Sequence, residues 1–163
     1  MRKFDAETAV AAIELEQMVV DYWQEIDLNG GRNATDFFTE DCTAEVGVVS
    51  FKGHAGAKKY YADRLESIRA QQKGGIRTSR HVFLNLRISF ENKSRATLSF
   101  LITTFAGSGN PPIMDATTPV AVSDARFECR LEADGQWRIL GFYGAAIFIG
   151  GEDFAKKALT GRR

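Results

Sequence analysis

The sequence is poor in cysteine, histidine and proline. Its 163 residues include two Cys, two His and three Pro. Cys42 and Cys129 each fall inside a predicted strand, and two cysteines make no disulfide framework, so we expect both to be buried thiols. The sequence also has no metal-ligand spacing, no phosphate-cradling glycine motif and no nucleophile elbow. It therefore predicts neither a bound metal nor a cofactor.

The sequence also lacks an excess of either charge and any long apolar run. Lys and Arg together number 21, as do Asp and Glu, so the formal net charge is zero. Nucleic-acid-binding proteins usually carry a basic excess. No apolar run approaches the roughly 20 residues of a membrane span, and no signal-peptide core follows the charged N-terminus. We therefore expect a cytoplasmic protein without nucleic-acid or membrane partners, and near-zero charge fits self-association.

Helical patterns come first in the chain. Hydrophobic residues make up 44% of the sequence, which is enough for the core of one domain spanning residues 1–163, with a polar tail at 150–163. A helix is predicted over about Glu7–Leu28, and Gly30 and Gly31 end it. Its apolar stripe follows the helical period and consists of Leu15, Met18, Val19, Tyr22, Trp23 and Ile26.

The second half of the chain alternates with a period of two. After a turn at 39–41, the predicted elements are a strand or hairpin at 42–51, a helix at 57–72, and strands at 77–90, 95–106, 117–132 and 137–149. The last strand is apolar on both faces, so it should be central and covered on both sides. Helices followed by strands predict an α+β domain, with a curved, mixed or antiparallel sheet around the helices and a pocket at its open end.

Asp27 and His81 are the candidate acid–base pair. An imidazole exchanges protons near neutral pH, and a carboxylate bonded to one ring nitrogen makes the other more basic. The helix macrodipole disfavours a carboxylate in the last turn of a helix, so helix stability does not explain Asp27, and its pKa is expected to rise somewhat. The alternative is that Asp27 belongs to the polar turn before Gly30 and faces water.

The direction in which His81 points is ambiguous. By simple alternation it shares a face with Phe83 and Asn85, while Val82 and Leu84 belong to the more apolar face. Alternation alone therefore predicts that His81 faces solvent. Two arrangements would turn it inward: the apolar face could be a subunit interface, or a bulge could shift the register and reverse every later side chain.

Several segments together resemble the SnoaL-like family of the superfamily named after nuclear transport factor 2. The resemblance covers about residues 8–149. The segments that carry it are Tyr22, Trp23 and Asp27, the run 37–42, Phe51 to His54, Ser79 to His81 with Asn85, and Gly135 to Ile139. It implies a cone-shaped domain with a pocket at its open end, and favours His81 facing inward.

The resemblance also implies an activity. At the site, the sequence is similar to scytalone dehydratase and bile-acid dehydratase, which place an Asp at the end of the first helix and a His on the long strand. We therefore expect a cofactor-independent dehydratase or isomerase acting on a small hydrophobic polycyclic, polyketide-like or steroid-like molecule. Asp27 and His81 would transfer protons, and Tyr22, Tyr60 or Tyr61 would polarise a carbonyl.

The expected substrate contacts and the alternatives complete the hypothesis. The side chains expected to contact the substrate are Trp23, Tyr61, Phe83, Asn85 and Tyr143, although Asn85 could instead bond a backbone group at a bulge. The chain is expected to form a homo-oligomer, a dimer through the sheet or a trimer. The alternatives are a non-catalytic binding or assembly module and a small subunit of a ring-hydroxylating oxygenase.

Overall fold

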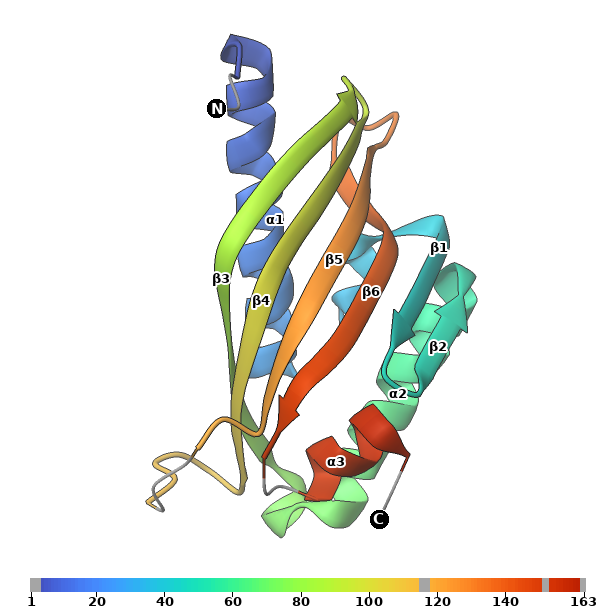
Figure 1. The fold of residues 1–163 in the computed structure, drawn as a ribbon. Helices are drawn as coiled ribbons and strands as arrows, with labels where there is room; N and C mark the ends of the chain where they lie inside the picture. Colours follow the sequence, from blue (N-terminus) through green and yellow to red (C-terminus); the bar gives the residue numbers. More distant parts are fainter. Residues whose placement is uncertain (1–3, 115–117, 151–152, 162–163) are drawn as a thin grey trace.

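The computed structural model describes residues 4–114, 118–150 and 153–161. The chain order is α1 (Ala6–Asn29), η1 (Ala34–Phe37), β1 (Phe38–Val46), β2 (Val49–Lys52), α2 (Gly53–Gln71), η2 (Lys73–Gly75), β3 (Arg77–Asn92), β4 (Arg95–Ser108), β5 (Ala121–Leu131), β6 (Trp137–Ile149) and α3 (Asp153–Thr160). The strands form one sheet in the order β2-β1-β6-β5-β4-β3. The sheet is curved, and α1 and α2 lie on the same side of it (Figure 1). The predicted α+β fold with a mixed sheet is confirmed.

Helix α1 supplies one wall of the core. Every residue of the predicted apolar stripe is buried, from Leu15 to Ile26. The helix ends where Gly30 adopts the left-handed conformation, with φ of 71°. Its buried stripe faces Leu98, Phe127 and Ile139 of the sheet, all of them fully buried. The end of α1 is therefore fixed against the sheet, which positions the residues of its last turn.

Three local predictions need correction. The polar residues 39–41 were expected to form a turn but lie within β1, where the pairing with β6 is irregular between Phe38 and Thr43. Helix α2 starts at Gly53 rather than near 57, because residues 53–56, expected to form a turn before the helix, make its first turn. Strand β5 starts at Ala121 rather than near 117, since Pro119 cannot donate to a strand ladder. Residue 117 itself lies outside the described residues.

Strand β6 is central, as predicted, but it is not covered on both faces along its whole length. It lies between β1 and β5. Its pairing with β1 ends at Gly144, while its pairing with β5 continues to Ile149. Ile147 and Phe148 lie beyond the last residue paired with β1 and are exposed, Phe148 by 68%. Both predicted buried thiols, Cys42 and Cys129, are buried and free.

A bulge in β3 determines which side chains face the helices. Asn85 has φ of 57°, and the pairing of β3 with β4 shifts between Leu84 and Arg87. Before the bulge, Val82 and Leu84 are exposed by 42% and 51%, so the alternate residues face inward. After the bulge, the other set of alternate residues faces inward, and Leu86, Ile88 and Phe90 pack against the core. The prediction from simple alternation was wrong for His81, and the bulge considered as an alternative is present.

Replacing Asn85 tests this bulge. A Cβ disfavours positive φ, and Asn tolerates it better than most residues. Asn85→Ala is therefore expected to lower the free energy of unfolding by about 1–2 kcal/mol. Asn85→Gly should cost less, because glycine adopts this conformation without steric strain. Urea unfolding of the two variants gives the comparison, and an alanine variant as stable as the glycine variant would contradict the assigned conformation.

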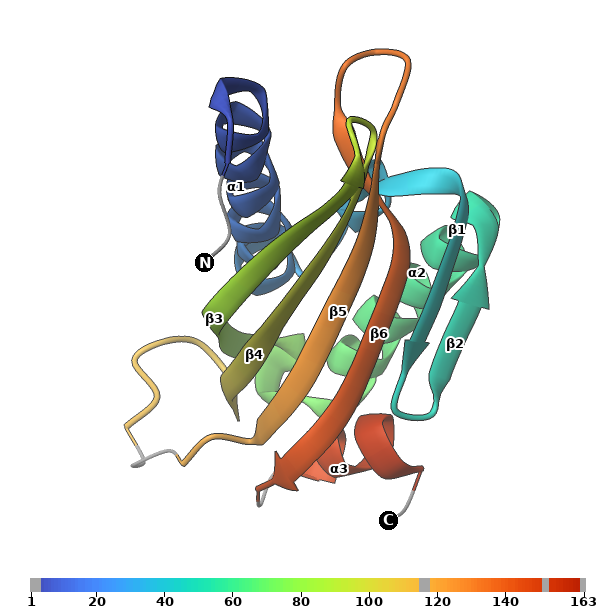
Figure 2. The ribbon, with the colours of Figure 1, turned by 45° about the horizontal axis from the view of Figure 1, so that its top comes forward.

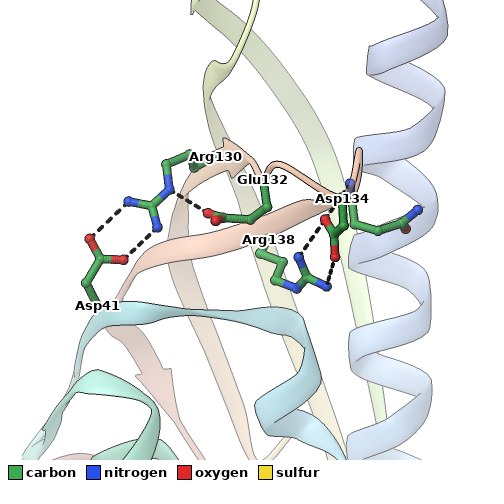
Figure 3. A network of polar contacts seen from close by, with 6 residues as sticks. Asp41, Arg130, Glu132, Asp134 and Arg138 are labelled. Atoms are coloured by element: carbon green, nitrogen blue, oxygen red, sulfur yellow. Dashed lines mark hydrogen bonds and ion pairs between the residues drawn. The ribbon is translucent and has the colours of Figure 1, made fainter.

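Ion pairs cluster at the end of the sheet where β5 turns into β6 (Figure 3). Arg130 donates two hydrogen bonds to Asp41, at 2.7 and 2.9 Å, and a third to Glu132. Arg138 bonds Asp134 in the same two-pronged way, at 2.7 and 3.0 Å. These pairs join β1 to β5 and close the hairpin. None of these residues lines the candidate site.

Candidate functional site

A cavity of ≈ 140 Å³ lies between the helices and the sheet. Its walls come from α1, the β1–β2 hairpin, α2, β3 and β6. The lining residues are Tyr22, Trp23, Ile26, Val46, Val49, Phe51, Tyr60, Tyr61, Arg64, His81 and Phe142. The walls are thus largely aromatic and aliphatic, with a few polar groups from separate elements, which is the usual composition of a small-molecule site.

Asp27, in the last turn of α1, is bonded to the start of β3. One carboxylate oxygen, Oδ1, accepts hydrogen bonds from Ser79 Oγ at 2.7 Å and from His81 Nδ1 at 2.6 Å. The other, Oδ2, accepts from the backbone N–H of His81 at 2.7 Å. The Asp27 side chain is only 7% exposed, so the alternative in which it faces water is excluded. The structure therefore brings the predicted acid–base pair together.

The protonation states of Asp27 and His81 follow from these contacts. Burial acts to raise the pKa of Asp27, but the hydrogen bonds from His81 and Ser79 outweigh it and the pKa is lowered. The predicted rise was wrong, because three donors stabilise the carboxylate more than the helix end destabilises it. Burial lowers the pKa of His81 more than the bond to Asp27 raises it. The pair at neutral pH is an ionised carboxylate and a neutral imidazole.

The geometry fixes which nitrogen of His81 is basic. Because Asp27 holds Nδ1–H, Nε2 carries the lone pair, and no described residue bonds to it. The indole of Trp23 stacks on the imidazole, with ring centroids 4.5 Å apart and planes 19° apart. His81 lines the cavity. The imidazole is therefore held in one orientation in the wall of the cavity, and Nε2 is its basic nitrogen.

Three tyrosines line the same cavity, and two of them share a hydrogen bond. Tyr22 Oη and Tyr61 Oη lie 2.7 Å apart. Burial raises the pKa of both phenols, so both stay protonated at neutral pH. Two hydroxyl protons share one mutual hydrogen bond, which leaves one proton for another acceptor. Burial also raises the pKa of Tyr60, whose ring lines the cavity beside Tyr61.

Three predicted substrate contacts do not line this cavity. Phe83 packs edge-on against Phe100, with centroids 6.0 Å apart. Asn85 is exposed at the bulge. Tyr143 follows the inward-facing Phe142, and its ring lies under Arg126 at 4.3 Å. Tyr22, Trp23, Tyr61 and His81 do line it, and Asp27 lies directly behind His81.

Ser79 and Arg64 were not among the predicted site residues, although Ser79 belongs to a segment that carries the family resemblance. Ser79 lies two residues before His81, so the two share a face of β3 and both reach Asp27. Arg64 follows Tyr60 by four residues and Tyr61 by three, which places it on the same side of α2. Both spacings are visible in the sequence. Among the described residues, no group of three or more His, Cys, Asp or Glu side chains is placed to hold a metal ion.

The lowered pKa values of Asp27 and His81 predict how stability varies with pH. Unfolded Asp and His titrate near about 3.9 and 6.5. Below these values the unfolded chain binds more protons than the folded chain, so stability is present above them and is lost as pH falls. The unfolding temperature should decline as pH drops through about 6.5. His81→Gln should flatten this decline in thermal melts, and an unchanged slope would contradict the prediction.

The fold and site place the protein in the α+β class with a cystatin-like, nuclear transport factor 2-like fold. Residues 8–142 match the SnoaL-like domain family, and the chain belongs to that family. The resemblance inferred from the sequence is thereby confirmed. No curated protein matches the chain by sequence. Among the described residues, no helix is long and apolar enough to cross a membrane.

Solved structures share the fold at low sequence identity. A putative scytalone dehydratase from Novosphingobium aromaticivorans matches with a TM-score of 0.70 and 16% identity, covering 90% of each chain. ActVI-ORFA from Streptomyces coelicolor matches at 0.69 and 14%, covering 84% of this chain and 97% of its own. A hexachlorocyclohexane dehydrochlorinase, LinA type 2, matches at 0.68 and 14%, covering 90% and 92%. At these identities the likeness shows the fold.

Proposed function

We propose that this protein is a cofactor-independent lyase or isomerase that acts on a small hydrophobic carbonyl compound. One observation carries the proposal: Asp27 holds His81 Nδ1–H at 2.6 Å, which leaves Nε2 as the basic nitrogen, and His81 lines a cavity together with three tyrosines. A buried, neutral imidazole of this kind is a general base suited to neutral pH. Two structural relatives named as a dehydratase and a dehydrochlorinase support an elimination.

The proposed dehydration uses His81 twice. Nε2 removes a proton from the carbon next to the carbonyl, and the electron pair moves to the carbonyl oxygen. The free hydroxyl proton of the Tyr22–Tyr61 pair bonds the resulting enolate oxygen. The enolate then re-forms the carbonyl and a new carbon–carbon double bond. The hydroxyl on the next carbon leaves with the proton carried by His81, and water is released.

An isomerisation would need the same groups. After the first proton transfer, the protonated His81 would return the proton to a different carbon of the extended enolate, and the double bond would move. Asp27 stabilises the imidazolium in both reactions, because its carboxylate is ionised. Dehydration and isomerisation therefore differ in whether the substrate carries a leaving group, and share the first step.

The volume of the cavity limits the size of the substrate group that can lie beside His81. Its volume is ≈ 140 Å³. An engineered apolar cavity of about 150 Å³ holds one benzene ring. A single ring therefore matches the space next to Nε2, and the further rings of a polycyclic or steroid-like substrate would have to extend beyond it.

The shared first step provides the test. The purified protein is incubated in heavy water with acetophenone and 1-indanone, and exchange of the protons next to the carbonyl is followed by NMR. Loss of water from 4-hydroxy-4-phenylbutan-2-one is followed by the absorbance of the enone. We expect exchange faster than in buffer, with dehydration if the protein is a lyase. Exchange and dehydration at the buffer rate would overturn the proposal and leave a non-catalytic binding module.

Exposed apolar side chains on the sheet favour self-association. Val82 and Leu84 on β3 and Ile147 and Phe148 on β6 are exposed apolar side chains in the single chain. Exposed apolar groups of this size favour burial against another surface. We propose that the sheet forms the contact of a homodimer, and sedimentation of the wild type against Leu84→Lys tests it. A monomeric wild type would remove this contact.

A further inference from the structure

A second cavity adjoins the first. Its volume is ≈ 300 Å³, and its walls are Val49, Tyr60, Asp63, Arg64, Ser67, Gln71 and Lys157. Val49, Tyr60 and Arg64 line both cavities, so the two share a wall. We call the cavity beside His81 the inner chamber and the second cavity the outer chamber. A molecule longer than one ring would have to pass between these shared residues to occupy both.

Two helices build the outer chamber. Tyr60, Arg64, Ser67 and Gln71 follow the helical period, so they share one face of α2. Lys157 comes from α3, which lies at the same end of the molecule as the C-terminal half of α2 (Figure 2). Gly47, between β1 and β2, approaches α3 so closely that an added Cβ would lie 2.6 Å from the Leu159 carbonyl oxygen. The hairpin thus packs against α3, the helix that carries Lys157.

The charges in the outer chamber are not balanced internally. Arg64 uses one guanidinium nitrogen to donate to the Gly30 carbonyl oxygen at 2.8 Å, and no described carboxylate pairs with it. Asp63, the acidic residue of this lining, is paired with Lys59 at 2.7 Å. Asp and Glu are absent from the residues that line the inner chamber. Arg64 and Lys157 therefore make this end of the site positive.

We propose that the substrate carries a carboxylate, which Arg64 and Lys157 bind in the outer chamber while its carbonyl-bearing part reaches His81 in the inner chamber. Arg64 is suited to this because its planar guanidinium retains donors after bonding Gly30. Ser67 and Gln71 supply further hydrogen-bond donors on the same face of α2. The placement of the carbonyl rests on the proposed function, whereas carboxylate binding does not.

Binding measurements separate the two claims. 3-Benzoylpropionate has one aromatic ring, a ketone and a carboxylate, and its primary amide is a neutral analogue of nearly the same shape. Calorimetry with the wild type should show the carboxylate binding about 10- to 100-fold more tightly than the amide, as expected for hydrogen bonds to a charged group. Equal affinity for the two compounds would overturn the subsite.

Variants assign the preference to named residues. Arg64→Gln should remove most of the preference for carboxylate over amide, Arg64→Lys should retain part of it, and Lys157→Gln should weaken it. Lys58→Gln removes an exposed charge from α2 outside both chambers. This variant should leave the preference for carboxylate over amide unchanged. The ratio of the two affinities within each variant is an internal control, because a folding defect would weaken the binding of both compounds. An Arg64→Gln protein that keeps the full preference would overturn the assignment.

The outcomes are distinct from those for catalysis. Selective carboxylate binding without exchange at the ketone would keep the subsite and remove the proposed reaction. Exchange with neutral ketones and equal binding of acid and amide would keep the reaction and remove the subsite.

Discussion

Replacing His81 by glutamine is expected to lower the rate of proton exchange by about 10²–10⁴-fold, the usual contribution of one general acid–base group. Glutamine can still donate a side-chain N–H to Asp27 and fills nearly the same space. It has no basic nitrogen to take the place of Nε2, which no described residue bonds. The variant thus removes the proton acceptor and keeps the contact with α1. The NMR exchange assay in heavy water measures the loss.

The chain supplies a matched control, because its other histidine lies elsewhere. His54, at the start of α2, has Nε2 2.9 Å from the Thr35 carbonyl oxygen and lines a different cavity. His54→Gln should leave the exchange rate near that of the wild type. Equal losses in the two variants, or an unaffected His81→Gln protein, would rule out His81 as the base.

The pH dependence of activity follows from the same imidazole. A general base works in its neutral form, so activity should fall on the acid side as His81 gains a proton. Because burial lowers the pKa of His81, the midpoint of that fall should lie below about 6.5, the value of an unperturbed histidine. The midpoint is read from the exchange rate across a pH series.

Local patterns predicted the helical part of the site well. The stripe from Leu15 to Ile26 could be predicted because the helical period repeats within a few residues. Asp27 follows from that helix, since it lies one residue after the stripe and three before Gly30. Tyr22 and Trp23 belong to the same stripe, and both line the inner chamber. These positions needed no knowledge of tertiary contacts.

The facing of His81 could not be predicted from alternation. It depends on one extra residue in β3, and the structure places that bulge at Asn85. Asn is depleted in strands and enriched at positive φ, but a single Asn within a strand pattern does not by itself locate a bulge. Tyr143, expected to contact the substrate, does not line the inner chamber for a related reason. Both faces of β6 are apolar, and alternation cannot tell which one lines a cavity. Arg64 is brought to His81 by the packing of α2 on the sheet, a contact between distant segments.

Replacing Asp27 by asparagine is the second change with a large expected effect. In the wild type, Asp27 accepts three hydrogen bonds, from Ser79 Oγ and from the side chain and backbone N–H of His81. Asparagine has one acceptor oxygen and one amide nitrogen that only donates. If its oxygen accepts from the backbone N–H, its NH₂ group faces His81 Nδ1. The imidazole then places its proton on Nε2, and the general base is lost.

The exchange rate of Asp27→Asn should therefore fall by a factor approaching that of His81→Gln, about 10²–10⁴-fold, although the imidazole is still present. The double variant should be little worse than either single one, because both remove the same function. Nitrogen-15 NMR of the ring distinguishes the mechanism: the wild type should carry its proton on Nδ1 and the variant on Nε2. A variant that loses activity while keeping the Nδ1–H form would show that Asp27 acts in another way.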